Sequence, residues 1–195
     1  MAIFGNQNTG TVNLSVTDNI CGGFYTVGSK SGVADSITVR LEAYGGPVSN
    51  QKVTCGLYKY VDYSSSYAGD LVGQTEVVAI NIAFGETEWK TFNFEAPKPN
   101  LSANTNYYIV VSAEAGAYLV LEGSEDAGQD IYKEVSYSDT LLDPLEGETA
   151  SSYRRCIYCT YTENPDEPKP VKINKIAGKT IKINKVNGKT IKISN

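Results

Sequence analysis

The stretch Ser36-Ile-Thr-Val-Arg-Leu-Glu-Ala-Tyr44 alternates apolar and polar side chains without interruption. Its apolar side chains occupy every second position: Ile37, Val39, Leu41 and Ala43. Because successive side chains of a strand point to opposite faces, these four would share one buried face. The stretch therefore predicts a long strand that packs against a core on one side.

The same alternation recurs along most of the chain, at 11–16, 23–28, 52–58, 75–82, 89–95, 106–113, 117–122 and 153–162. Turn-forming residues separate these segments, at Gly45-Gly46-Pro47, Gly69-Asp70, Pro97-Lys98-Pro99-Asn100 and Asp143-Pro144. A helical period of 3.6 residues is missing from the sequence. About nine short strands at this spacing predict an all-β fold, an antiparallel jelly-roll β-sandwich over residues 1–163.

A proline-rich hinge is expected at 164–170, since Asn164-Pro-Asp-Glu-Pro-Lys-Pro170 would resist strand pairing. A basic tail at 171–195 follows, built from a ten-residue repeat that begins at Ile173 and again at Ile183. The pair Asn187-Gly188 favours a type I′ hairpin turn. Two repeats cannot bury a core alone, so we predict a short β-repeat tail that assembles on a partner. Its apolar contact residues would be Ile173, Ile181, Ile183, Val186, Ile191 and Ile193.

Charge is divided unevenly along the chain. Residues 1–167 carry all 22 acidic residues and nine of the 17 basic ones, a net charge of −13, whereas residues 168–195 carry eight lysines and no acid. Such asymmetry indicates an interaction tail. The tail lacks arginine and aromatic side chains, so nucleic acid is not the expected partner. No run of apolar residues is long enough to span a membrane, and no signal peptide is expected at the N-terminus.

Four cysteines are present: Cys21, Cys55, Cys156 and Cys159. The spacing of Cys156 and Cys159 occurs in redox and zinc motifs, but the surrounding sequence predicts a strand and lacks further knuckle ligands. We expect two buried thiols that pack as small apolar side chains. A disulfide among the four is the alternative, since connectivity cannot be read from sequence.

The sequence contains no histidine, which removes the commonest general base and the Ser-His-Asp and Cys-His types of catalysis. Glycoside hydrolysis by two carboxylates stays formally open, but no acidic pair stands out. We therefore expect a protein that is not an enzyme and has no cofactor, apart from a structural calcium ion.

Two segments carry candidate binding residues. The first gathers four tyrosines around three serines: Tyr58, Tyr60, Tyr63 and Tyr67. Tyrosine and serine are typical of recognition surfaces for sugars or proteins, although tyrosines that close one end of the core are the alternative. The second segment gathers three carboxylates, Glu125, Asp126 and Asp130, which would suit calcium but lack the spacing of an EF-hand.

Several short sequences carry a resemblance: Ile3-Phe4-Gly5, Cys55-Gly-Leu-Tyr58, Leu71-Val-Gly-Gln-Thr-Glu76, Trp89-Lys-Thr-Phe-Asn-Phe94 and Arg155-Cys-Ile-Tyr-Cys-Thr-Tyr161. On these residues, 3–162 resembles a jelly-roll domain of phage, bacterial and archaeal surface proteins that is related to carbohydrate-binding modules. The tail resembles Lys-(Ile/Val)-Xaa-Gly repeats that end phage structural proteins. Each match is a strand signature, so the resemblance implies the fold more strongly than an activity.

The leading hypothesis is a non-enzymatic virion structural or accessory protein, such as a capsid decoration, head-fibre or tail-associated subunit. Its partners would be other virion proteins or copies of itself, and surface glycans, and it would be located in the virion. The alternative is a carbohydrate-binding module of a cell-surface or secreted prokaryotic protein, located outside the cell.

Overall fold

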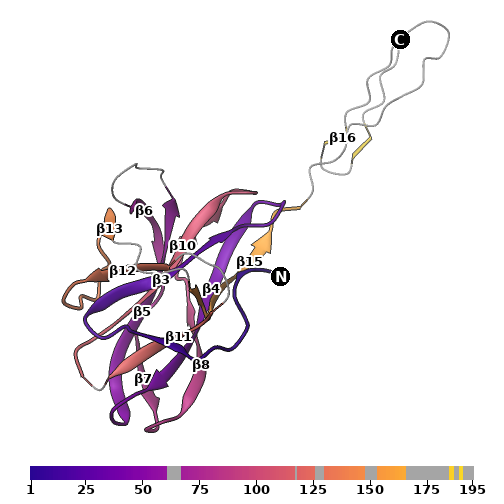
Figure 1. Cartoon of the computed structure of the whole chain (residues 1–195). Coiled ribbons are helices and arrows are strands. Elements are labelled where there is room, and N and C mark those ends of the chain that lie inside the picture. The colour runs from indigo at the N-terminus through magenta and orange to yellow at the C-terminus, as the bar shows by residue number, and fades with distance from the viewer. Residues whose placement is uncertain are drawn as a thin grey trace, which may run out of the picture. The chain divides into compact units, whose positions relative to one another are not determined.

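The protein's computed structural model describes residues 1–60, 67–116, 118–125, 130–147, 153–165, 185–186 and 189–190. The chain divides into two compact units, Met1–Glu163 and Asn164–Asn195. The described part of the first unit consists of strands and connections (Figure 1). No helix long and apolar enough to cross a membrane occurs among the described residues.

Two sheets make up the first unit. The first sheet contains β1 (Ala2–Gly5), β2 (Val12–Ser15), β4 (Gly32–Ala43), β8 (Thr87–Asn93), β9 (Asn100–Leu101), β11 (Leu119–Ser124), β14 (Arg154–Arg155) and β15 (Ile157–Glu163). The second contains β3 (Asn19–Thr26), β5 (Val48–Tyr60), β6 (Tyr67–Gln74), β7 (Val78–Ile82), β10 (Asn106–Ala113), β12 (Asp130–Glu134) and β13 (Leu145–Gly147).

The named strands of both sheets pair antiparallel, in the orders β1-β15-β4-β11-β14 and β12-β3-β10-β5-β6-β13. Strands that are distant in sequence lie side by side, as with β1 and β15 (Figure 1). The predicted all-β, antiparallel, two-sheet architecture is confirmed. The jelly-roll connectivity stays a prediction.

The core lies between the two sheets and follows the period-two pattern. Leu41 of β4 and Ile157 of β15 meet Leu57 of β5 and Ile109 of β10 in one cluster of buried side chains. Strand β10 is buried on both faces, because Tyr108 and Val110 belong to a second cluster on the outer side of its sheet. Leu141 and Leu145 also belong to that cluster, so the segment after β12 covers this side of the second sheet.

One predicted turn is wrong. Gly69-Asp70 lies inside β6, where Gly69 pairs with Tyr60 and Asp70 with Lys59. A Cβ atom at Gly69 would lie 3.0 Å from the carbonyl oxygen of Lys59 and 3.1 Å from the Cβ of Tyr58. The glycine therefore marks a close approach between two strands, which a sequence pattern does not distinguish from a turn.

All four cysteines are free and buried, and for Cys156 and Cys159 this agrees with the packing interpretation. Cys159 lies in the main core, whereas Cys156 precedes β15 and lies outside the strand. Burial raises the pKa of Cys21 to about 12 and that of Cys156 to about 11. These two thiols therefore remain protonated at neutral pH, which makes them poor nucleophiles and poor metal ligands.

In the second unit, β16 (Lys185–Val186) and β17 (Lys189–Thr190) pair antiparallel. Val186 lies opposite Lys189, so Asn187 and Gly188 alone connect the two strands. A two-residue connection is what the predicted hairpin requires. The turn residues themselves lie outside the described residues, as do Ile173, Ile181, Ile183, Ile191 and Ile193.

Candidate functional site: a polar cleft with two tyrosine walls

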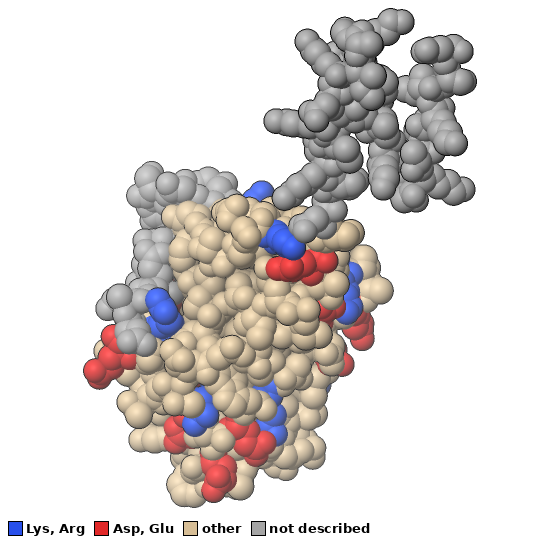
Figure 2. Space-filling view, turned by 90° about the vertical axis from the view of Figure 1, so that its right-hand side faces the viewer, with Lys and Arg blue, Asp and Glu red and all other residues tan. Residues whose placement is uncertain are grey.

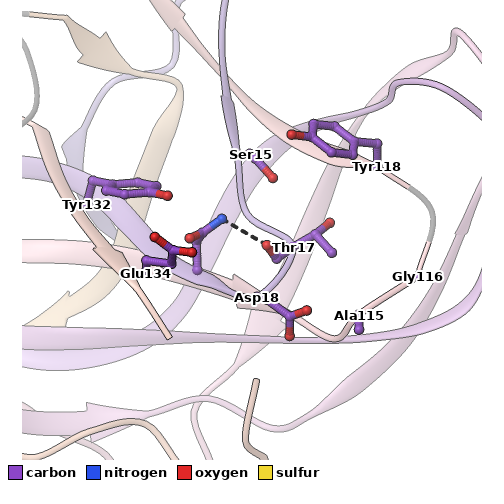
Figure 3. Close-up of a pocket in the computed structure, with 9 residues that line it drawn as sticks. Ser15, Thr17, Asp18, Ala115, Gly116, Tyr118, Tyr132 and Glu134 are labelled. Atoms are coloured by element: carbon purple, nitrogen blue, oxygen red, sulfur yellow. Dashed lines mark hydrogen bonds between the residues drawn. The ribbon is translucent and has the colours of Figure 1, made fainter. Parts of the chain in front are cut away.

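A cleft of about 480 Å³ lies beside the start of β3. Three separate segments line it: Ser15, Thr17, Asp18 and Asn19 from the β2–β3 corner, Ala115, Gly116 and Tyr118 from the β10–β11 connection, and Tyr132 and Glu134 from β12 (Figure 3). Its size is within the range of small-molecule sites in proteins.

The β2–β3 corner forms the floor of the cleft. Asp18 has a φ of 51°, in the left-handed region that aspartate tolerates better than most residues. Its backbone N–H donates to the carbonyl oxygen of Ala113 at 2.9 Å, and its Oδ1 accepts from the backbone N–H of Tyr137 at 3.0 Å. The Thr17 hydroxyl oxygen accepts from the N–H of Leu119 at 3.2 Å. These bonds fix the corner to the β10–β11 connection and to the segment after β12.

Two hydrogen-bond acceptors lie next to each other on one wall. Asn19 of β3 pairs with Glu134 of β12, so their side chains are cross-strand neighbours. The Asn19 amide nitrogen donates to the carbonyl oxygen of Thr17 at 2.8 Å. The Asn19 Oδ1 is buried and has no hydrogen-bond partner within the described part of the chain. Because buried polar atoms are almost always hydrogen-bonded, this oxygen needs a donor that a bound water or a ligand would supply.

Tyr118 and Tyr132 flank the floor from opposite sides in Figure 3, with Ser15 and Thr17 between them. Tyr118 is 56% exposed, so its ring is accessible from the cleft side of the surface. Tyr132 is partly buried, and burial, reinforced by the charge of Glu134, raises its pKa. The Tyr132 phenol is therefore neutral at physiological pH. Both tyrosines offer a flat apolar ring with a polar tip.

The cleft is acidic. Asp18 and Glu134 line it, and the lining residues that the structure describes include no lysine or arginine. Together with the free Asn19 oxygen, this surface accepts hydrogen bonds and disfavours anions. It suits an uncharged ligand that has an apolar face for a tyrosine ring and several hydroxyl or amide donors.

The predicted tyrosine site is not formed as expected. Tyr58 is fully buried and its hydroxyl donates to the carbonyl oxygen of Leu142 at 2.7 Å. Tyr60 packs against Phe24 and Tyr108, with ring centroids 5.0 and 6.0 Å apart. Tyr58 belongs to the second core cluster and Tyr60 packs against it, which is the core-closing alternative for these two residues. Tyr63 and the side chain of Tyr67 lie outside the described residues.

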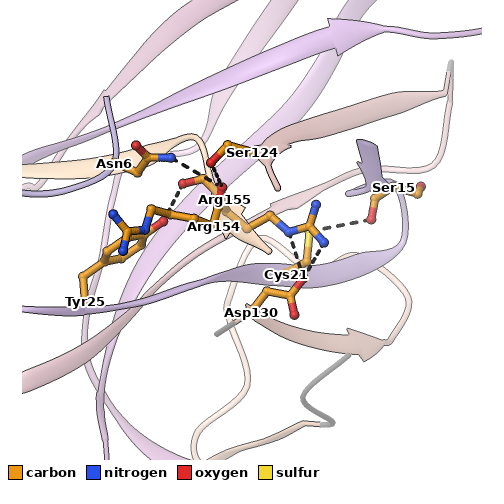
Figure 4. Close-up of polar contacts among 8 residues, drawn as sticks. All are labelled: Asn6, Ser15, Cys21, Tyr25, Ser124, Asp130, Arg154 and Arg155. Carbon is orange, nitrogen blue, oxygen red and sulfur yellow. Dashed lines mark hydrogen bonds and ion pairs between the residues drawn. The ribbon is translucent and has the colours of Figure 1, made fainter. Parts of the chain in front are cut away.

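Of the three predicted calcium ligands, two are described, and they differ in burial. Glu125 is exposed, Asp126 lies outside the described residues, and Asp130 is fully buried. The Asp130 carboxylate accepts two hydrogen bonds from Arg155, one of them from Nε at 3.0 Å (Figure 4). Asp130 is therefore committed to an internal ion pair. In the portion of the chain that the structure describes, no group of three acidic or cysteine side chains could hold a metal ion.

The Arg155–Asp130 pair is the centre of a buried polar network (Figure 4). Arg155 is 2% exposed and Asp130 0%. The Tyr25 hydroxyl donates to the carbonyl oxygen of Arg155, and the Cys21 thiol to that of Ser15. Tyr25 and Cys21 lie in β3, Arg155 in β14 and Asp130 in β12, so this network joins the two sheets. The Ser15 carbonyl also links it to the floor of the cleft.

No family model, curated protein or solved structure matches this chain. The function must therefore be inferred from the geometry of the chain itself.

The cleft residues were missed by sequence reasoning, because no motif joins them. Thr17-Asp18-Asn19 lies between two predicted strands, and its small polar residues are an ordinary corner signal. Tyr132 and Glu134 lie on β12, which the alternation did not predict. The one available signal was Tyr118, an aromatic residue that follows the turn-like Ala115-Gly116.

Proposed function

We propose that the protein is a non-enzymatic glycan-binding protein that holds an uncharged sugar in the cleft between Tyr118 and Tyr132. The observation that carries the proposal is the combination of two tyrosine walls with adjacent unshared acceptors. A pyranose ring offers both partners, an apolar face of C–H groups and a rim of hydroxyl donors. Tyrosine and short polar side chains are the groups that proteins use at such recognition surfaces.

The acceptors give the site its selectivity. Hydroxyl or acetamido groups of the sugar would donate to the Glu134 carboxylate and to the Asn19 Oδ1. An uronic or sialic acid would bring a carboxylate beside Glu134 and Asp18, which costs free energy in a partly desolvated cleft. Neutral sugars, and N-acetylhexosamines in particular, are the ligand class that this arrangement favours.

The two carboxylates of the cleft, Asp18 and Glu134, support binding of a sugar without its hydrolysis. Hydrolysis of a glycosidic bond requires one free carboxyl acid and one free base or nucleophile on either side of the bond. Asp18 is used to accept the N–H of Tyr137 and to hold the corner. Of the two carboxylates in the described lining, Glu134 is exposed, whereas Asp18 is half-buried and holds the corner through its Oδ1.

Replacing Glu134 by alanine in the full chain is expected to weaken binding of N-acetylglucosamine about 10- to 100-fold, since a hydrogen bond to a charged group contributes about 1.5–3 kcal/mol. Isothermal titration calorimetry measures the change. The matched control is Glu146→Ala, which removes an exposed carboxylate of β13 outside the cleft and should leave the affinity unchanged. Equal affinities for all three proteins would contradict the cleft as the binding site.

We further propose that this module is displayed on a virus particle, as a decoration, head-fibre or tail-associated subunit. The basic ten-residue repeat tail supports this setting, since its eight lysines complement the acidic remainder of the chain and would steer assembly. On the first unit, Lys and Arg side chains are interspersed with Asp and Glu over the face in Figure 2, so this face has no concentrated basic patch.

Removal of residues 165–195 is expected to abolish self-association or docking on purified virus particles while the first unit stays folded. Light scattering at low and high salt measures the first effect, and a pull-down with particles the second. Salt should weaken the association of the full chain, because the attraction between tail and acidic surface is screened. A full chain that stays monomeric and binds no particle would contradict the virion setting, without bearing on the cleft.

A further inference from the structure

Three exposed aromatic side chains lie on neighbouring connections of the sandwich: Tyr44 after β4, Phe84 between β7 and β8, and Tyr118 before β11. They are 58%, 65% and 56% exposed. The backbone N–H of Tyr44 donates to the carbonyl oxygen of Tyr118 at 2.8 Å, and that of Gly85 to Ala43 at 2.9 Å. The three connections are therefore tied together, and we call these residues the aromatic row.

The aromatic row begins at the cleft. Tyr118 belongs to both, because it forms one wall of the cleft. Its ring centroid lies 6.5 Å from that of Tyr44, and the two rings are inclined by 59°. A ligand longer than one sugar ring could therefore contact both Tyr118 and Tyr44. Neighbouring exposed apolar side chains, unlike singly scattered ones, are typical of ligand or partner sites.

The electrostatic character of the row is the same as that of the cleft. The three connections, residues 42–47, 83–87 and 114–118, contain three glutamates and no lysine or arginine. Of these, Glu86 is exposed, whereas Glu42 accepts a hydrogen bond from Asn13 at 3.0 Å. The row thus continues a surface that accepts hydrogen bonds and offers apolar rings, and it favours the same uncharged ligand chemistry.

We propose that the ligand is a linear neutral oligosaccharide, with one sugar unit in the cleft and the following units on Tyr118 and Tyr44 towards Phe84. This inference rests on the proposed glycan binding and specifies its substrate class. Each added unit that contacts a ring binds as part of an already bound molecule, so it adds affinity without a second loss of translational freedom. Chain length, rather than the identity of a single sugar, becomes the main determinant of affinity.

Titration of the full chain with N-acetylglucosamine and with its β-1,4-linked tetramer tests the inference. The tetramer should bind at least tenfold more tightly than the monosaccharide. Tyr44→Ala should reduce the affinity for the tetramer towards that for the monosaccharide and leave monosaccharide affinity unchanged, because Tyr44 does not line the cleft. Leu142→Ala, which truncates an exposed apolar side chain outside the row, is the control and should change neither affinity.

Equal affinities for the two sugars would overturn the oligosaccharide inference and leave glycan binding in the cleft intact. No binding of either sugar would overturn the proposed function, and the inference with it. If Tyr44→Ala leaves the tetramer affinity unchanged but abolishes self-association in light scattering, the row is a protein interface and the inference is wrong. Circular dichroism melts of each variant establish that an altered affinity is not a loss of folding.

Discussion

Replacement of Asp130 by alanine is expected to lower the free energy of unfolding by about 3–5 kcal/mol, because it leaves the Arg155 guanidinium charged and unpaired in the interior. Arg155 is 2% exposed, and Asp130 accepts from both its Nε and its Nη2. A loss of this size is a large part of the stability of a typical domain.

Chemical denaturation followed by circular dichroism measures this effect. The matched control is the double variant Asp130→Leu with Arg155→Met, which removes both charges and keeps apolar volume. Buried ion pairs are often replaced by apolar side chains at little cost, so the double variant should be more stable than the single one. The lower limit for a buried group that loses its partner is about 1 kcal/mol. If the free energy of unfolding of Asp130→Ala differs from that of the unaltered protein by less than this, Arg155 is solvated without Asp130.

Replacement of Gly22 by alanine is expected to lower the free energy of unfolding by about 3 kcal/mol. This is the upper end of the range for an extra group forced into a packed interior. Gly22 lies in β3, opposite Val110 of β10 and Ile131 of β12. An added Cβ would lie 1.9 Å from the carbonyl oxygen of Ile109 and 2.7 Å from the Cα of Val110. Both neighbours are backbone atoms, so two strands would have to separate.

Thermal melts of Gly22→Ala and of Gly46→Ala provide the comparison. Gly46 lies in the β4–β5 turn, where an added Cβ meets nothing within 4 Å. Its replacement should change the free energy of unfolding by no more than about 0.5 kcal/mol, as for most surface substitutions. Equal melting temperatures for the two variants would contradict the close strand approach at Gly22.

The fold was largely predictable because burial on one face imposes a period of two. The predicted strand 106–113 coincides with β10, and the alternation from Ser36 lies within β4. Strand β12 was missed because Asp130-Ile-Tyr-Lys-Glu134 has two adjacent hydrophobic residues between charged ones, without alternation. The burial of Asp130 depends on Arg155, which is 25 residues away in sequence. No local pattern contains that pairing.

The cleft was not predictable for a related reason. Its acceptors meet through the register between β3 and β12, where Asn19 lies opposite Glu134. Sequence patterns predict strands but do not give the register between strands that are far apart in the chain. For the tyrosine-rich segment, the sequence predicted a binding surface where the structure has core residues. Its composition is typical of a binding surface, but the strand period places Tyr58 in a core. That core becomes visible only in the structure, where the Tyr58 hydroxyl donates to the carbonyl oxygen of Leu142.

The most direct test of glycan binding is an amide chemical-shift titration of the ¹⁵N-labelled full chain with N-acetylglucosamine. If the sugar binds in the cleft, we expect saturable shifts in the three segments that line it, at Thr17–Asn19, Tyr118 and Tyr132–Glu134. Trp89 and Tyr158, whose rings lie 5.6 Å apart on the first sheet, should not shift. Saturable shifts confined to Trp89 and Tyr158, or no saturable shift at all, would contradict binding in the cleft.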